Sequence, residues 1–305
     1  MLRTDLKLGV KTGYPKRVSL IRAYVDLMKL RVVELLIITT LPAMVLAEKG
    51  LPSFGLVAAT LIGGTLAAGS SNAFNMVIEA ETDKLMARTS KRPLVVGTVS
   101  HLQALVFASV IGVISLAIFQ IFTTPLATLL TALAIFYYVV IYTILLKPNT
   151  SQNIVWGGAA GCMPVLIGWA AVTGSLTWVP VAFFMVIFFW TPPHFWALAI
   201  KYKDDYAAAG IPMLPVIATI NSVKKQMWFH TIGMVITSLG VNWSANLPWW
   251  CWVITVAIAL GFGRELLKID GPDSNKAAAR LFQWSITYLS VFSLLLAIAA
   301  LVVNP

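Results

Sequence analysis

Residues 60–94 read TLIGGTLAAGSSNAFNMVIEAETDKLMARTSKRPL, and within them an apolar run gives way to a dense group of charges. A second apolar run, LQALVFASVIGVISLAIF, follows at 102–119. Charged side chains are costly inside hydrocarbon, so a chain that gathers them between two apolar runs leaves the bilayer there and then re-enters it. The stretch therefore predicts two membrane-spanning helices joined by a polar loop.

The composition of the whole chain also indicates an integral membrane protein. Of its 305 residues, 59% are hydrophobic and 11% are charged, whereas a soluble domain carries about 25% charged residues. Apolar runs long enough to cross about 30 Å of hydrocarbon recur along the chain. The two cysteines, Cys162 and Cys251, lie in such runs without the spacing of metal ligands, which is typical of packed membrane cysteines.

Nine membrane-spanning helices account best for the apolar runs. They are predicted at 32–48, 54–76, 102–122, 124–145, 154–173, 178–200, 227–246, 248–266 and 282–303. Pro and Gly inside these segments do not exclude helices, because neighbouring helices can satisfy the backbone groups that they free.

Basic residues are segregated between the two sides of these nine spans. The segment 1–31 and the loops after the second, fourth, sixth and eighth spans hold 21 of the 22 Lys and Arg, with Lys49 as the exception. The positive-inside rule makes that side cytoplasmic. We therefore expect a basic cytoplasmic tail at 1–31, a membrane domain at 32–305 and a C-terminus outside the cell membrane. The net charge of +10 follows from this topology and requires no nucleic-acid partner.

Oxygen-bearing side chains in the first polar loop are spaced four residues apart. Four residues turn a helix by about 400°, so Asn75, Glu79 and Asp83 form one stripe with about 6 Å of rise between neighbours. Asn72 lies one turn earlier, on the neighbouring edge. Carboxylates stacked in this way repel one another unless a cation lies between them, and Mg²⁺ bridging to a phosphate meets this need.

Cations that match phosphate oxygens follow this stripe within about two turns, namely Lys84, Arg88 and Arg92. Carboxylates with Arg and Lys beside a membrane mouth predict a site for Mg²⁺ and a diphosphate. An ordinary solvated loop with salt bridges is the alternative.

A second polar loop follows the sixth predicted span, with the sequence AIKYKDDYAAAGIPMLPV at 199–216. It lies four spans after the first, and therefore on the same side and at the corresponding place in a second half of the chain. Internal repeats with polar sites at matching positions recur in membrane proteins. The predicted fold is all-α, with two four-helix repeats around a central cavity plus a ninth helix.

Several stretches resemble one protein family. The pattern Asn-x-x-x-acid-x-x-x-Asp after the second span resembles the first acidic motif of the UbiA-type intramembrane prenyltransferases. Within that superfamily, five stretches resemble the protoheme IX farnesyltransferase (heme O synthase) family: DKLMARTSKRPL (83–94), YTILLK (142–147), QNIVWGGAAGCMPVLIGW (152–169), WTPPHFWALAI (190–200) and DDYAAAGIPMLPV (204–216). The resemblance extends from about Lys29 to the last predicted helix.

This resemblance implies a reaction and its reactants. A farnesyl group passes from farnesyl diphosphate to a vinyl group of heme b and water is added, which gives heme O and diphosphate. Mg²⁺ is the implied cofactor, heme b is a substrate, and a heme A synthase or a terminal-oxidase assembly factor is an implied partner beside the lipid bilayer. The chain departs from the superfamily pattern at Glu79, where Asp is usual, and at Lys201, where many members have an acid.

The predicted site residues come from both polar loops and from the spans beside them. Tyr206 could stabilise a cation with its ring face, and His194 could contact heme iron, a propionate or the diphosphate. The predicted metal ligands are Asn75, Glu79, Asp83 and Asp205, which with Tyr206 form the catalytic set; the predicted substrate-binding residues are Asn72, Lys84, Arg88, Arg92, Lys147, Asn153, His194, Lys201 and Asp204.

Three other functions fit parts of the same pattern. A prenyltransferase of the superfamily could act instead on a quinone precursor such as a hydroxybenzoate, or on a chlorin. A transporter with acidic ion sites would place charges near the midplane of the membrane, whereas here they cluster in loops on one side. A heme-insertion factor without catalytic activity would need no stripe of acids.

Overall fold

The computed structural model describes residues 19–30, 33–87 and 89–303, and in this part of the chain it contains helices and no strands. The helices are α1 (Leu20–Met28), α2 (Val33–Glu48), α3 (Phe54–Ile78), α4 (Ala80–Lys84), α5 (His101–Phe122), α6 (Pro125–Phe136), η2 (Tyr137–Leu146), α7 (Asn153–Thr173), α8 (Trp178–Lys201), α9 (Lys203–Ala208), α10 (Leu214–Ile217), α11 (Ile220–Ser244), α12 (Trp249–Leu267) and α13 (Ser274–Val303). The prediction of an all-α fold is confirmed.

Seven helical segments among the described residues are long and apolar enough to cross a membrane, with α6 and η2 counted as one span. The protein is therefore a multi-pass membrane protein. The other two predicted spans correspond to α2, which has 16 residues, and to α11, which has 25 residues but includes Lys224, Lys225 and several polar side chains. Both are helices at the predicted positions, and the total of nine spans stays a prediction.

Polar residues mark the helix ends just outside the apolar runs. The Ser53 hydroxyl accepts a hydrogen bond from the Leu56 N–H at the start of α3, and Ser100 and Gln103 form a reciprocal capping box at the start of α5. At the other end of a helix, Gly174 has a φ of 67° and terminates α7 in the left-handed conformation that glycine adopts without strain.

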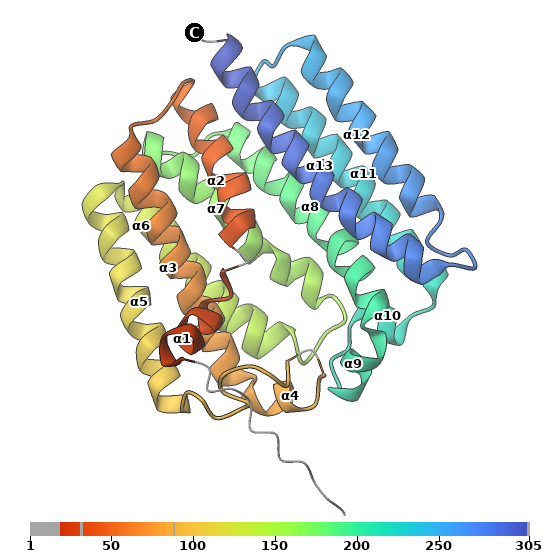
Figure 1. Cartoon of the computed structure of the whole chain (residues 1–305). Helices are drawn as coiled ribbons and strands as arrows, with labels where there is room; N and C mark the ends of the chain where they lie inside the picture. The colour runs from red at the N-terminus through yellow and green to blue at the C-terminus, as the bar shows by residue number, and fades with distance from the viewer. Residues whose placement is uncertain (1–18, 31–32, 88, 304–305) are drawn as a thin grey trace, which may run out of the picture.

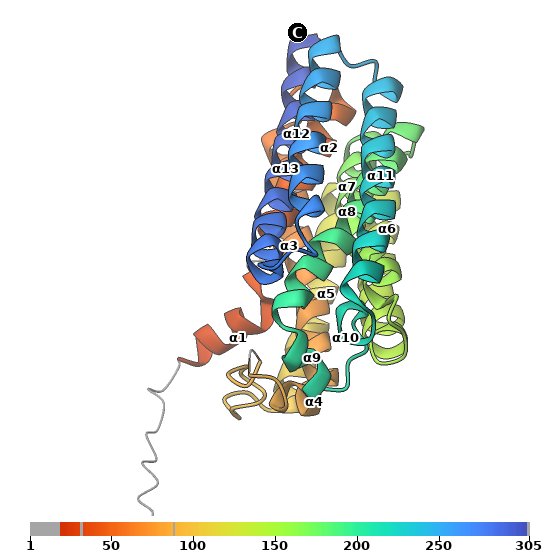
Figure 2. The ribbon, with the colours of Figure 1, turned by 90° about the vertical axis from the view of Figure 1, so that its right-hand side faces the viewer.

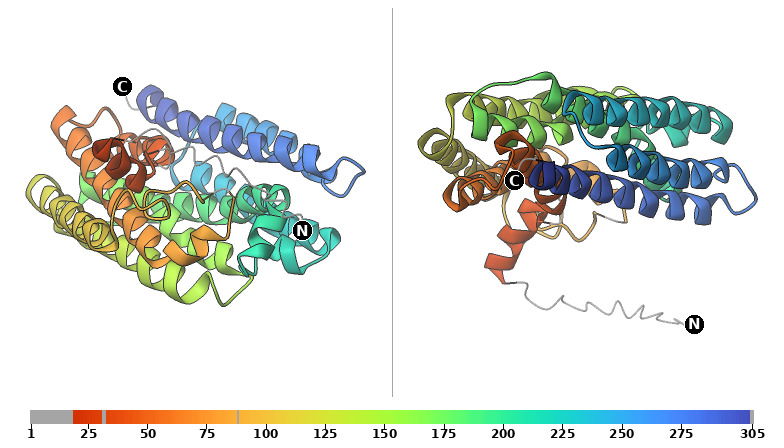
Figure 3. Two further views of the ribbon diagram at one scale, coloured as in Figure 1. Left: turned by 60° about the horizontal axis from the view of Figure 1, so that its bottom comes forward. Right: turned by 90° about the horizontal axis from the view of Figure 1, so that it is seen from above.

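The helices form two groups that meet along α2 and α7 (Figure 1). The first group contains α3, α5 and α6, and the second contains α8, α11, α12 and α13. α2 packs against α7 and α13, and α6 packs against α7, so both groups join into one bundle. α4 and α9 lie together at one end, which we call the polar end, and α1 projects from the side of the bundle near it (Figure 2 and Figure 3).

Close helix packing depends on small residues, as between α3 and α5. The Ser70 hydroxyl donates to the Ala108 carbonyl at 2.8 Å, and the Ser115 hydroxyl donates to the Gly63 carbonyl at 2.7 Å. A Cβ added at Gly112 would lie 2.8 Å from the Ser70 hydroxyl oxygen. Small residues that let backbones approach, and hydroxyls that bond across the contact, are typical of helix association in membranes.

Replacement of Gly112 by valine tests this interface. The added side chain must displace Ser70 and its bond to α5, so we expect the variant to lose about 1–3 kcal/mol of stability, as overpacked cores do. The thermal midpoint of the detergent-solubilised protein should fall clearly. Gly240→Val is the matched control, because a Cβ at this α11 position meets nothing within 4 Å. Equal midpoints for the two variants would contradict the account of this interface.

Candidate active site

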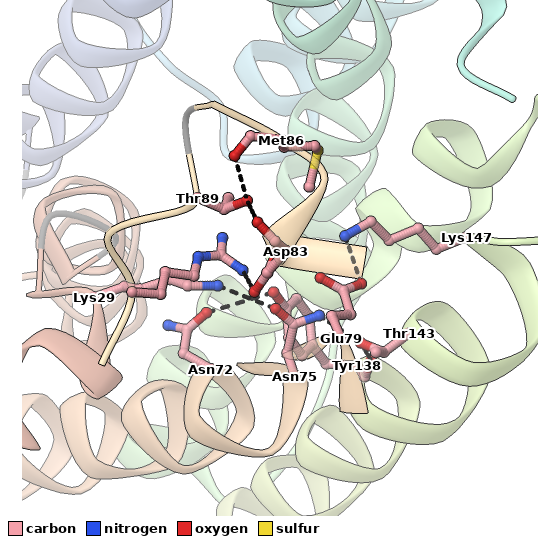
Figure 4. Close-up of polar contacts among 11 residues, drawn as sticks. Lys29, Asn72, Asn75, Glu79, Asp83, Met86, Thr89, Tyr138, Thr143 and Lys147 are labelled. Carbon is pink, nitrogen blue, oxygen red and sulfur yellow. Dashed lines mark hydrogen bonds and ion pairs between the residues drawn. The ribbon is translucent and has the colours of Figure 1, made fainter. Parts of the chain in front are cut away.

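The stripe of oxygen ligands lies where α3 ends at the polar end of the bundle (Figure 4). Asn75 is in the last turn of α3, Glu79 lies between α3 and α4 with φ −93° and ψ 7°, and Asp83 is in α4. The Glu79 N–H donates to the Asn75 carbonyl at 2.9 Å, and the Asp83 N–H donates to the Glu79 carbonyl at 2.8 Å. The spacing of four residues thus keeps the three side chains on one side across the joint.

Both acids in this stripe are buried and paired with cations from elsewhere in the chain. Glu79 is 8% exposed and accepts a hydrogen bond from the Lys147 ammonium at 2.5 Å. Asp83 is 1% exposed and forms an ion pair with Arg92. A buried carboxylate is tolerated only when it is paired, so each cation stabilises the charge that it contacts. Asp83 Oδ1 is buried and has no hydrogen-bond partner among the residues that the structure describes.

Lys29 adds a third cation to the site. It ends α1 with a φ of 50°, a conformation uncommon for residues other than glycine. Its ammonium donates to Asn75 Oδ1 at 3.0 Å, and the Asn72 amide donates to the Met28 carbonyl at 3.1 Å. These two bonds attach the end of α1 to α3. Burial, followed by the charge of Arg92, lowers the pKa of Lys29 to about 7.

A π-helix supplies the opposite wall of the site. Residues five apart bond in such a helix, and π-helical turns occur frequently at functional sites. At the end of η2 the Lys147 N–H donates to the Tyr142 carbonyl, five residues earlier, at 2.9 Å. Tyr138 donates to Asn72 Oδ1 at 3.4 Å, and the Asn75 amide donates to the Thr143 hydroxyl at 3.2 Å. The wider turn therefore aligns several polar side chains against α3.

A cavity of about 420 Å³ leads from this site into the bundle. Its polar mouth includes Lys29, Asn72, Asn75, Arg92 and Lys147, and the rest of its lining is largely apolar and small, including Ala67, Ala68, Ala134, Gly157, Gly161, Met163 and Pro164. The described helices that line it are α2, α3, α5, α6, η2, α7, α8 and α9. A cavity that is charged at one end and apolar along its length suits a molecule with an anionic head and a long hydrocarbon chain.

The two polar loops lie next to each other, as the sequence predicts. Met86 of the first loop is buried in one apolar cluster with Ile211 and Met213 of the second. Tyr206 and Met213 also line the cavity. Asp205 is partly buried, whereas Lys201 and Asp204 are exposed. The second loop therefore brings Tyr206 to the cavity and leaves its charged groups nearer the surface.

Other predicted site residues have varied positions. Lys84 is at the surface, where it pairs with Glu81 at 2.6 Å, and Arg88 lies outside the described residues. The buried Asn153 amide donates to the Thr150 carbonyl at 2.7 Å and so caps the turn that follows Lys147.

His194 lies beside the cavity, on α8 against α13. Its Nδ1 lies 2.6 Å from the Ser285 hydroxyl oxygen, and its ring stacks between those of Trp190 and Phe282, with centroids at 4.2 and 4.5 Å. Trp190 lines the cavity, so the histidine is one ring removed from it.

Sequence reasoning missed three members of the site, namely Lys29, Tyr138 and Thr143. In the sequence, Lys29 is one of many basic residues near the first predicted span, and nothing distinguishes it from the others. Tyr138 and Thr143 are five residues apart in an apolar run, a spacing that has no meaning on an α-helix and becomes a shared face only in a π-helix.

The residues of the stripe fit a hard divalent cation in their chemistry. Mg²⁺ prefers oxygen ligands and commonly combines one or two carboxylates with substrate phosphates. Asp83 Oδ1, buried and without a partner in the described part of the chain, is an oxygen of this type. Across the described ranges no three His, Cys, Asp or Glu side chains form a complete metal cluster, so the protein side of such a site would be small and a phosphate would supply further oxygens.

Comparison with solved structures shows a shared fold. The chain superposes with a TM-score of 0.75 and 14% identity on a structure of digeranylgeranylglyceryl phosphate synthase, covering 93% of this chain and 99% of that one. A UbiA homolog from Archaeoglobus fulgidus, solved with DMAPP and Mg²⁺, superposes with a TM-score of 0.67 and 18% identity over 88% and 99% of the two chains.

Fold and site together define a membrane-embedded prenyltransferase. Residues 36–287 match the model of the UbiA prenyltransferase family, and the chain belongs to that family. Among similar sequences, a protein from Frankia casuarinae named protoheme IX farnesyltransferase is 50% identical over 286 residues, which cover 92% of this chain and 98% of that protein. A protein of the same name from Streptomyces coelicolor is 47% identical over 91% of this chain and 90% of its own length.

The position of Lys29 predicts an unusual titration. Because burial and the charge of Arg92 disfavour its charged form, the Lys29 amine should lose its proton near pH 7. Trace labelling with an amine reagent, read by mass spectrometry across a pH series and normalised to labelling at high pH, measures this transition. Half-maximal reactivity of Lys29 near its ordinary pKa of 10.5 would contradict this environment.

The lowered pKa of Lys29 also makes the stability of the folded protein depend on pH. Between about pH 7 and the unfolded value of 10.5, the unfolded chain binds a proton at Lys29 that the folded chain does not. The contribution of Lys29 to stability should therefore improve as pH rises through this window. Lys29→Met should abolish that part of the pH dependence of the thermal midpoint.

Proposed function

We propose that this protein transfers a farnesyl group from farnesyl diphosphate to a vinyl group of heme b, with addition of water, to form heme O and diphosphate. The observation that carries the proposal is the group of buried acids and cations at the mouth of an apolar cavity. The names of the similar proteins support the choice of farnesyl donor and heme acceptor.

The diphosphate head would bind at the polar mouth of the cavity. Lys29, Arg92 and Lys147 bring three cationic groups to it from three different segments. Phosphate oxygens compete well for such groups, because charge-assisted hydrogen bonds to phosphate are strong. In the structure two of these cations neutralise Glu79 and Asp83, and binding of an anion would shift them towards the phosphate.

Glu79 and Asp83 would then be available to a metal ion. Asn75, Glu79, Asp83 and, from the second loop, Asp205 would hold Mg²⁺, which neutralises the charge that develops on the leaving diphosphate. Asp83 Oδ1, which is buried and contacts no hydrogen-bonding group of the described residues, supports the place of Asp83 in this set. Lys84, Lys201, Asp204 and Arg88 remain proposed contacts at the rim.

The isoprenoid chain would lie along the apolar part of the cavity. Breaking the C1–O bond sends its electron pair to the diphosphate and leaves positive charge on the allylic carbons. The rings of Tyr138, Tyr142 and Tyr206 line the cavity near its mouth, and an aromatic face attracts a cation. The apolar lining excludes water, which would otherwise capture the allylic cation.

The acceptor step requires electrons from the vinyl group. Its terminal carbon bonds to C1 of farnesyl, and the positive charge passes to the vinyl carbon attached to the porphyrin, which delocalises it. Water adds to that carbon and loses a proton, which leaves a hydroxyl group. We propose that His194, held by Ser285 between two aromatic rings, contacts the porphyrin from the side of α8.

We also propose nine membrane spans in the cell membrane, with the N-terminus cytoplasmic and the C-terminus outside. The distribution of Lys and Arg supports this orientation. The polar end of the bundle would then face the cytoplasm, where both substrates arrive. A heme A synthase or an oxidase assembly factor is the proposed recipient of the product.

Incubation of the purified protein with heme b, farnesyl diphosphate and Mg²⁺ tests the proposal directly. Mass spectrometry should detect heme carrying a hydroxyethylfarnesyl group only when the metal is present. Asp83→Asn should lower kcat/KM by on the order of 10²-fold or more, because it removes stabilisation of the leaving group. Asp205→Asn should also reduce turnover.

A matched control distinguishes the loss of a site carboxylate from the loss of a surface charge. Glu81→Gln changes an exposed acid on the same short helix as Asp83 and should leave turnover nearly unchanged. Prenylation of a phenolic acid in place of heme would show that the acceptor is wrong. A folded protein that neither prenylates an acceptor nor binds a prenyl diphosphate would contradict the proposal altogether.

A further inference from the structure

The apolar end of the cavity is lined by side chains from four helices. Thr60 of α3, Phe119 of α5, Thr131 of α6 and Ile167 of α7 lie there. Phe119 is fully buried, and it belongs to an apolar cluster with Ile167, Ala127, Leu130, Ala170 and Ala171. This cluster leaves the cavity with a floor.

Phe119 reaches this position because α3 and α5 approach closely. A Cβ on Gly63 would lie 2.9 Å from Cε2 of the Phe119 ring, so only glycine leaves room for the ring against α3. One turn earlier on α5, the Ser115 hydroxyl bonds to the Gly63 carbonyl at 2.7 Å and fixes the register of the two helices. The ring is therefore held between α3 and the cavity.

The depth of the cavity above this floor can be read along α3. With the diphosphate head beside Asn75, the prenyl chain begins near Asn72 at the polar mouth. Thr60, the α3 residue that lines the cavity farthest from the mouth, is twelve residues from Asn72, or about 18 Å at 1.5 Å per residue. An extended isoprene unit has four main-chain carbons and spans about 5 Å, from carbon–carbon bonds of about 1.5 Å. Three units thus need about 15 Å and four about 20 Å. Fifteen carbons fit between the head group and the floor, and twenty do not.

We propose that Phe119, supported by Ile167, sets the length of the prenyl chain that the enzyme accepts and selects a fifteen-carbon donor over a twenty-carbon one. The inference rests on the proposed function only in taking a prenyl diphosphate as the ligand. It is independent of the acceptor, and so it can be tested by binding alone.

Binding of geranyl, farnesyl and geranylgeranyl diphosphates, measured by calorimetry with Mg²⁺ and without heme, tests this proposal. The wild type should bind the fifteen-carbon chain at least about tenfold more tightly than the twenty-carbon chain, since a pocket floor that excludes a whole isoprene unit discriminates at least as well as one that excludes a methylene. Phe119→Ala should reduce this preference about tenfold. Phe122→Ala is the matched control, because Phe122 lies on the same helix and is 62% exposed.

Two further variants keep the test decisive if Phe119→Ala folds poorly. Ile167→Ala deepens the floor from another helix and should also favour the longer chain. Gly161→Val acts in the opposite direction, because a Cβ there meets nothing within 4 Å and Gly161 lines the cavity about 9 Å above Ile167 along α7. It should weaken farnesyl diphosphate relative to geranyl diphosphate.

The outcomes distinguish this proposal from the proposed function. Equal affinity of the wild type for the two longer chains, or an unchanged preference in Phe119→Ala and Ile167→Ala with binding intact, would overturn the assignment of the floor alone. It would indicate that the chain leaves the cavity sideways between helices. Failure of the folded wild type to bind any of the three diphosphates would overturn both.

Discussion

The fold at the polar end of the bundle depends on the neutralisation of two nearly fully buried carboxylates, Glu79 and Asp83. Each acid lies at the boundary of a region where an unpaired charge is very costly, and each is paired with a cation from a different part of the chain, Lys147 after η2 and Arg92 after α4. Lys29, attached to Asn75, adds a third cation and brings α1 to the same point. The acids therefore bring four segments of the chain together at one place, and the same charges that pair with one another in the fold suit a metal ion and a diphosphate.

The apolar part of the bundle complements this polar end. Glycine and alanine on α3, α6 and α7 leave space that larger side chains would fill. The cavity occupies this space. Elsewhere small residues serve the opposite purpose: a Cβ on Gly168 of α7 would lie 2.8 Å from the Thr40 side chain of α2, so glycine lets these two helices approach closely. Small residues thus leave a cavity in one place and allow close helix contact in another. The outcome depends on how near the facing helix lies.

Much of this arrangement could be predicted from the sequence. Long apolar runs predicted the helices, and the spacing of Asn75, Glu79 and Asp83 predicted a shared stripe because it depends only on helix geometry. The adjacency of the two polar loops followed from their matching places in the chain. Lys29 could not be predicted, because its contact with Asn75 depends on the left-handed turn at the end of α1. The face shared by Tyr138 and Thr143 depends on a π-helix, which no simple periodicity indicates. The role of Phe119 depends on packing against Gly63, more than fifty residues away.

Direct observation of a metal ion on the diphosphate would test the central claim most closely. Mn²⁺ can replace Mg²⁺ as a paramagnetic probe, and farnesyl thiodiphosphate can serve as a slowly reacting donor. Electron–nuclear double resonance then reports whether the metal contacts phosphorus. The account predicts a ³¹P coupling in the wild type and in Glu81→Gln that is lost in Asp83→Asn. Mn²⁺ bound without any ³¹P coupling, or a coupling unchanged in Asp83→Asn, would contradict it.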